Sequence, residues 1–141
     1  MRVLDNLVPE KVFYYFEELC NIPHGSTNTK AISDYCVNFA KERGLAYHQD
    51  AENNIIILKN GSKGYEDSKP VIIQGHLDMV CEKEADCTID FEKDGLSLAI
   101  DGDYIYAEGT TLGGDDGIAV AMALAILDDD TLEHPPIEAV F

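Results

Sequence analysis

The sequence predicts an α/β fold, in which a mixed sheet is flanked by helices in three layers. Short apolar runs rich in β-branched residues alternate with stretches whose apolar residues have helical spacing. One such run, residues 71–74, is apolar at nearly every position, which is typical of a strand buried on both faces. Residues 117–127 are apolar all round, which is typical of a buried helix. We therefore expect the 141 residues to lie in one domain.

Two helices are predicted before the first strand. Residues 9–20 begin with Pro9, which the first turn of a helix tolerates, and continue with helical periodicity. The second helix would be capped by Ser26 or Thr27 and would end at Gly44. Its apolar residues recur at spacings of three and four: Ile32, Cys36, Phe39 and Ala40.

The rest of the chain predicts short strands and one further helix. The predicted strands are residues 47–50, 54–59, 71–74, 104–107 and 137–141. Residues 81–102 are acidic and irregular, which indicates a long surface loop with some hairpin content. The apolar helix at 117–127 is followed by three aspartates, 128–130, which the negative end of the helix dipole disfavours.

Acidic residues outnumber basic ones 27 to 10, and the formal net charge is -17. Such a surface repels phosphate backbones and anionic lipids, so we expect no nucleic-acid partner and no membrane partner. The first residues carry acid where a signal peptide needs an apolar core, and the longest apolar run is too short to cross a bilayer. The four cysteines show no metal-binding spacing and are expected to be reduced thiols: Cys20, Cys36, Cys81 and Cys87. We therefore expect a cytoplasmic protein.

A His-x-Asp pair, His76 and Asp78, follows the strand predicted at 71–74. Ligand sites in α/β sheets gather at the carboxyl ends of strands. In extended chain these two side chains point to the same side, so that Asp78 could orient the imidazole of His76 and raise its basicity toward a metal ion. The alternative is a polar pair at a strand end that binds no metal, because His-x-Asp is a weak pattern.

Two aspartates, Asp115 and Asp116, stand between glycines just before the apolar helix. Capping of the helix explains one of them, and we assign that role to Asp116. Glycines permit close approach of the backbone, so Asp115 is interpreted as a carboxylate aimed at metal ions. Imidazole and carboxylate together suit zinc and its first-row neighbours. The remaining histidines are expected at the surface: His24, His48 and His134.

These motifs resemble those of the di-zinc hydrolase superfamily that contains glutamate carboxypeptidases, acetylornithine deacetylases and cytosolic dipeptidases. Residues 75–78 and 113–117 match its two N-terminal metal motifs in order and in approximate spacing. Within the superfamily the chain is most similar to the aminoacyl-histidine dipeptidases. That likeness covers nearly all of the chain and is carried by residues 22–26, 71–80 and 109–118.

The resemblance implies a role for each site residue. His76 would bind one of two divalent metal ions, Asp115 would bridge both, and Asp78 would hold His76 in place. The ions would be zinc, with cobalt or manganese as alternatives. A cis peptide bond is implied between Asp115 and Asp116. The reaction would be hydrolysis of a dipeptide of the Xaa-His type, such as β-alanyl-histidine, by a water molecule that bridges the metals.

The resemblance also implies that residues 1–141 are the N-terminal portion of a catalytic domain, without its paired glutamates, its other metal ligands or its lid and dimerisation domain. We expect the chain to be inactive or nearly so by itself, and a homo-oligomer stays open. The strand at 137–141 would expose an apolar edge through which chains associate. The alternatives are a tripeptidase, a broad dipeptidase or a deacylase of the same superfamily, or a non-catalytic module that binds a metal or a partner protein.

Overall fold

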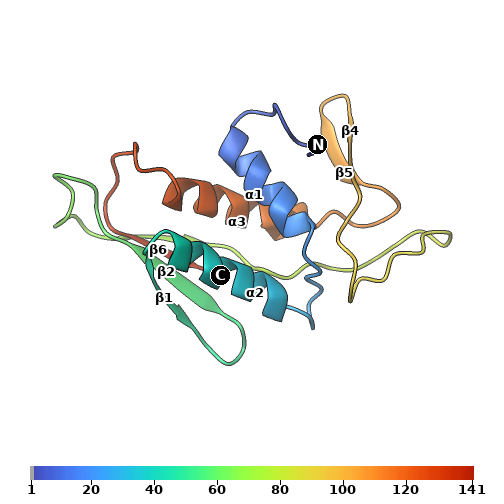
Figure 1. Ribbon diagram of the computed structural model, residues 1–141, viewed down its shortest axis with the longest axis horizontal. Coiled ribbons are helices and arrows are strands. Elements are labelled where there is room, and N and C mark those ends of the chain that lie inside the picture. Colours follow the sequence, from blue (N-terminus) through green and yellow to red (C-terminus); the bar gives the residue numbers. More distant parts are fainter. Residues whose placement is uncertain (1) are drawn as a thin grey trace.

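A mixed β-sheet and three helices form the body of the molecule in the computed structural model, which describes residues 2–141 (Figure 1). The elements in chain order are α1 (Glu10–Cys20), α2 (Lys30–Glu42), β1 (Ala46–Gln49), β2 (Ile55–Lys59), β3 (Val71–Gln74), β4 (Leu98–Asp101), β5 (Tyr104–Ala107), α3 (Gly114–Leu127) and β6 (Ile137–Val140). The predicted mixed α/β class is confirmed. Some hairpin content was expected within residues 81–102; β4 lies in this range and pairs with β5, which is the strand predicted at residues 104–107.

The main sheet has the strand order β1-β2-β6-β3. Its pairs are antiparallel except β3 with β6, which run parallel. The last strand, β6, therefore lies inside the sheet, and the expectation that it would present an exposed edge is wrong. The edges of this sheet are β1 and β3.

The described helices cover one face of the sheet, so the described residues show two of the three expected layers. On β2, Ile55 and Ile57 are fully buried toward the helices, whereas Ile56 and Leu58 on the opposite face are exposed. On β3, Val71 is 48% and Ile72 is 64% exposed, so the prediction of a strand buried on both faces is wrong for this segment. The reason is its position: β3 is an edge strand, and no described element covers the second face of the sheet there.

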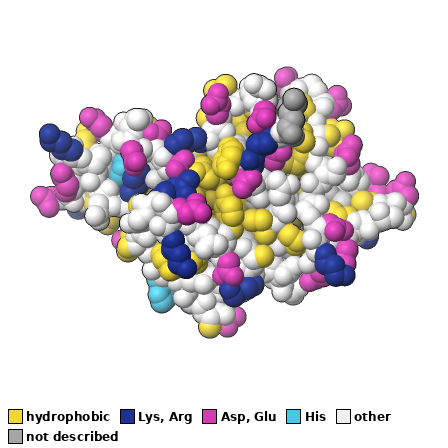
Figure 2. Space-filling model, viewed as in Figure 1, with side chains coloured by type: hydrophobic (Ala, Val, Ile, Leu, Met, Phe, Trp, Pro, Cys, Tyr) yellow, Lys and Arg dark blue, Asp and Glu magenta, His cyan; other side chains and the backbone are white. Residues whose placement is uncertain are grey.

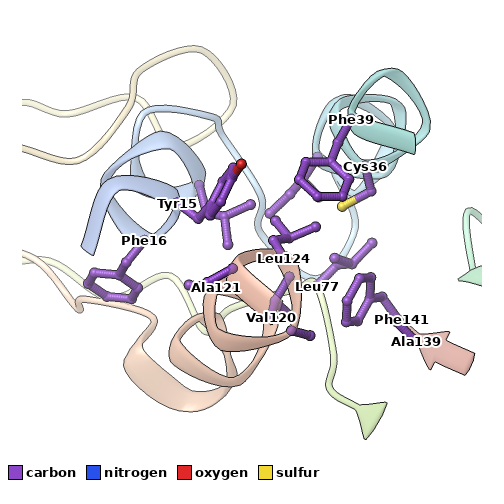
Figure 3. Packing of buried hydrophobic residues seen from close by; sticks show 14 of the residues in the cluster. Tyr15, Phe16, Cys36, Phe39, Leu77, Val120, Ala121, Leu124, Ala139 and Phe141 are labelled. Carbon is purple, nitrogen blue, oxygen red and sulfur yellow. The ribbon is translucent and has the colours of Figure 1, made fainter. Parts of the chain in front are cut away.

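Helix α3 forms the centre of the core (Figure 3). Ala121 and Leu124 are fully buried, and α1 packs along α3 through Tyr15 and Phe16. Met122 is 51% exposed, so the helix is buried on most of its surface but not all round. The molecule has the expected acidic surface, and Figure 2 shows acidic side chains spread over one face while apolar side chains gather near the middle, where α1 lies beside α3.

Basic residues from other elements neutralise the end of α3. Asp128 accepts a hydrogen bond from Arg43 Nε at 2.5 Å and forms an ion pair with Lys11 at 2.9 Å. Lys59 Nζ donates to the carbonyl oxygen of Leu127 at 2.9 Å. The acids that local rules disfavour at a helix C-terminus are thus offset by cations that arrive through the tertiary fold.

Helix α2 begins at Lys30, with Thr29 at the N-cap position and no side-chain cap. The prediction that Ser26 or Thr27 caps it is therefore wrong, and the Ser26 hydroxyl donates instead to the carbonyl oxygen of Met79 at 3.4 Å. Gly44 does follow the helix, with a left-handed φ of 65°.

All four cysteines are free, as predicted. Burial raises the pKa of both Cys20 and Cys36 to about 12, so these thiols stay protonated and act as apolar core groups. Among the described residues, no helix has the length and hydropathy that crossing a membrane requires.

Candidate metal centre

His76 lies directly beyond the end of β3. The amide of Gly75 still donates to the carbonyl oxygen of Val140 at 3.1 Å, which extends the parallel pairing with β6 by one step. The chain leaves the sheet after this bond, so His76 stands at the carboxyl end of two parallel strands. This is the place where α/β sheets gather their ligand sites.

The imidazole of His76 is held on one side by Asp78. Its Nδ1 atom donates to the Asp78 backbone carbonyl oxygen at 2.9 Å and lies 3.1 Å from the carboxylate Oδ1. Because Nδ1 carries the proton, Nε2 has a free lone pair in the neutral ring. Nε2 lies 3.1 Å from Oδ1 of Asp115, whose side chain is 96% exposed. The structure thus brings together the three residues that sequence reasoning singled out.

His76 and Asp78 each shift the pKa of the other. Burial alone would lower the pKa of His76, but the hydrogen bonds to Asp115 and Asp78 and the nearby carboxylate charges outweigh it and raise that pKa. The Ser26 hydroxyl, and after it the charge of His76, hold the pKa of Asp78 below its usual range. Asp78 is therefore an ionised acceptor at neutral pH and suits the task of orienting the ring.

A turn that contains a left-handed glycine carries Asp115 to this position. Gly113 has a left-handed φ of 70°, and a Cβ atom there would lie 3.0 Å from Met79 Sδ. Only glycine allows this conformation and this approach together. The peptide bond between Asp115 and Asp116 is cis, as the resemblance predicted, and both aspartates have non-helical backbone angles.

Asp116 does not cap the helix, contrary to the expectation. Gly113 precedes α3 and no side chain caps its first turn, while non-helical angles at Asp115 and Asp116 interrupt the helix before Gly117. The carboxylate of Asp116 instead turns toward the end of β3, where a Cβ atom on Gly75 would lie 3.1 Å from Oδ2. The absence of a side chain at Gly75 lets the two motifs meet.

Two of the three remaining histidines are buried rather than exposed. His134 donates from Nδ1 to its neighbour's carbonyl oxygen at 2.8 Å, and His48 alone lies at the surface as predicted. His24 is only 4% exposed and lies beside the candidate centre, where its backbone carbonyl oxygen accepts from Met79 N at 3.0 Å. Burial lowers the pKa of His24 and keeps the ring neutral. One signal in the sequence pointed to His24 as part of the centre: it lies in residues 22–26, one of the segments that carry the resemblance.

The donor set suits a metal ion but is small. Two ligands that each lie about 2 Å from one zinc ion are roughly 3 Å apart, which agrees with the 3.1 Å between His76 Nε2 and Asp115 Oδ1. Within residues 2–141, however, no group of three or more histidine, cysteine or acidic side chains is arranged to hold an ion. The residues present are those of part of a site.

The geometry agrees with the comparisons to known proteins. The cytosol non-specific dipeptidase of Escherichia coli strain K12 is 42% identical over 140 residues, which cover 99% of this chain and 29% of that protein. The crystal structure of aminoacylhistidine dipeptidase from Vibrio alginolyticus matches with a TM-score of 0.94 and 38% identity, over 97% of this chain and 28% of that one. The predicted resemblance to these dipeptidases is confirmed. No family model matches the chain.

Two structures of lower sequence identity share the fold of this chain. A tripeptidase from Staphylococcus aureus matches over 92% of this chain and 35% of its own, with a TM-score of 0.71 and 22% identity. Aminopeptidase PepT from Bacillus cereus gives a TM-score of 0.70 and 19% identity, over 93% of this chain and 35% of that one. The chain spans 29% of the Escherichia coli dipeptidase that it resembles, which is less than a third of that protein's length.

Proposed function

We propose that this chain contributes His76, Asp78 and Asp115 to the metal centre of a dipeptidase. The observation that carries the proposal is the continuous contact from Asp78 through the ring of His76 to Asp115. It presents a ring nitrogen and an exposed carboxylate side by side, 3.1 Å apart, in a chain 42% identical to a dipeptidase. A polar His–Asp pair without a metal would not need the second carboxylate on the far side of the ring.

Each residue has its own task in the proposed centre. His76 would bind one divalent ion through Nε2, and Asp115 would bridge two ions with its carboxylate, with zinc expected and cobalt or manganese as alternatives. When bound, these ions would activate a water molecule and polarise the carbonyl of the scissile amide. Asp78 would keep the proton of His76 on Nδ1, so that the lone pair of Nε2 stays aimed at the ion.

The proposed centre is incomplete within the described residues. They offer two protein ligands and no group of three or more side chains that could hold an ion, and the resemblance implies that the general base lies outside them. We infer that the chain corresponds to the N-terminal portion of a catalytic domain, and its coverage of 29% of the relative supports this. By itself it should bind metal weakly and catalyse little or nothing, because loss of a general base costs about 100-fold or more in rate.

The expected substrate is a dipeptide, and the expected location is the cytoplasm. The name of the Vibrio alginolyticus enzyme favours a C-terminal histidine, whereas the name of the Escherichia coli relative favours broad dipeptide cleavage and a cytosolic location. Both readings stay in the proposal, because no described side chain is assigned to contact the substrate.

A panel of substrates separates these readings. The product of the whole gene is assayed with Zn²⁺ on β-alanyl-histidine, other dipeptides, a tripeptide and an N-acetyl amino acid. Cleavage confined to the first indicates Xaa-His specificity, and cleavage of many dipeptides indicates the broader activity. The 141-residue chain is assayed in parallel. Turnover by this chain alone would contradict the proposal of a partial site.

A further inference from the structure

His24 lies between the two segments that carry the proposed ligands. Its backbone accepts a hydrogen bond from Met79 N at 3.0 Å, and Gly25 bridges to Met79 as in a parallel sheet. The loop at residues 22–26 therefore runs along the chain directly after Asp78. This ties the backbone of His24 to the His76 segment.

The ring of His24 is directed at the other segment. Nδ1 donates to the carbonyl oxygen of Ile22 at 2.6 Å, which sets the orientation of the ring. Nε2 then faces Gly113: a Cβ atom at that position would lie 3.4 Å from Nε2 and 3.0 Å from Met79 Sδ. The ring and the Met79 side chain form the surface on which the turn rests, two residues before Asp115.

We infer that His24 is a positioning residue of the metal centre, which holds the turn at Gly113 against the His76 segment so that His76 Nε2 and Asp115 Oδ1 stay in register. The inference rests on the proposed function, because it concerns how the chain presents its ligands. A role confined to the loop would need the bond from Nδ1 to Ile22 but would not need the Nε2 edge of the ring. These two halves of the side chain can be tested separately.

Asparagine at this position separates them. In His24→Asn the amide nitrogen can replace Nδ1 and keep the bond to Ile22, while the part of the ring that reaches Gly113 is removed. His24→Ala removes both. His134→Asn is the matched control, because His134 is also buried and also donates from Nδ1 to a carbonyl oxygen, but it lies at the opposite end of β3 and β6.

Co²⁺ binding to the 141-residue chain is followed by its visible absorption and by calorimetry, and thermal unfolding is measured without metal. We expect His24→Asn to melt close to wild type but to bind Co²⁺ about 10-fold more weakly, the loss typical when a group that supports a ligand is removed. His24→Ala should lose both stability and affinity. His134→Asn should bind Co²⁺ like wild type.

A second measurement needs no metal. The amide of Gly117 donates to the carbonyl oxygen of Gly113 at 3.0 Å within the turn. In His24→Asn we expect its hydrogen exchange to become roughly 10-fold faster than in wild type, because the turn loses its support and opens locally. Unchanged exchange would count against the inference.

The outcomes keep the two proposals apart. If wild type and His24→Asn bind Co²⁺ equally, His24 serves only the loop and the inference is overturned, while the metal centre stands. If the wild-type chain binds no Co²⁺ at all, the weak binding predicted for this part of the centre is contradicted, and the hydrogen exchange of Gly117 alone decides whether His24 supports the turn.

Discussion

His76 Nε2 and Asp115 Oδ1 lie 3.1 Å apart although 39 positions separate them in the chain. Three features of the fold bring them together. The pairing of β3 with β6 places His76 at a strand end, the left-handed Gly113 turns the second segment inward, and Gly75 leaves room for the carboxylate of Asp116. The following predictions test this arrangement.

Substitution of His76 should abolish the binding of divalent metal. In His76→Ala the Nε2 donor is lost, and the single remaining carboxylate of Asp115 is a poor site for zinc. We expect Co²⁺ affinity, measured by calorimetry, to fall at least roughly 100-fold. His48→Ala is the control, because His48 is exposed on β1 and should be dispensable. Equal losses in both variants would place the ion elsewhere.

The charge of Asp78 should matter more than its size. Asp78→Asn keeps the shape of the side chain but removes the carboxylate that accepts from His76 Nδ1. We expect Co²⁺ affinity to fall about 10- to 100-fold, as is typical when the partner of a metal-binding histidine is lost. Asp86→Asn, at an exposed loop position, should leave affinity unchanged. Full affinity in Asp78→Asn would show that His76 needs no orienting carboxylate.

Metal affinity should depend on pH through His76. Its pKa is raised in the metal-free chain, and a metal ion must displace the proton from the ring. Affinity is therefore highest at alkaline pH and declines as the pH falls through the raised pKa, beginning above the ordinary histidine value of about 6.5. Co²⁺ titrations between about pH 8 and pH 6 check this. A flat profile would indicate that His76 does not bind the ion.

Gly113 should be less replaceable than Gly44. Both have left-handed φ angles, of 70° and 65°, so alanine costs about 1–2 kcal/mol at either position. A Cβ atom at Gly44 would have no neighbour within 4 Å, whereas one at Gly113 would meet Met79 and His24. We expect Gly113→Ala to reduce the free energy of unfolding by roughly 1 kcal/mol more than Gly44→Ala. Urea unfolding measures both, and equal losses would mean that the contact at Gly113 is loose.

Elements with a strong local pattern were predicted well from the sequence. The strand at residues 104–107 coincides with β5, and the apolar periodicity of residues 9–20 matches α1 within one residue. Such patterns are local, because the spacing of apolar side chains reports which face of an element is buried. The candidate ligands of the centre were predicted from equally local patterns. The glycines and the His-x-Asp spacing are adjacent in the sequence to the residues whose positions they set.

Features that depend on distant neighbours were predicted wrongly. Residues 71–74 look like a strand covered on both sides, but whether a second layer covers them depends on other parts of the fold. His24 looks like a loop residue, and its burial comes from Met79 and Gly113. Asp116 follows the rule for a helix cap, yet the turn at Gly113 directs its carboxylate to Gly75.

The sequence by itself determined the α/β class, the order of most elements and the choice of three candidate residues for the metal centre, because each rests on side chains that are close in the chain. Only the tertiary structure decided that β6 lies inside the sheet, that the cations Arg43, Lys11 and Lys59 offset the acids after α3, and that His76 and Asp115 meet. The physical reason is that strand pairing and close packing join groups far apart in the chain, and no local pattern of residues encodes which groups will meet.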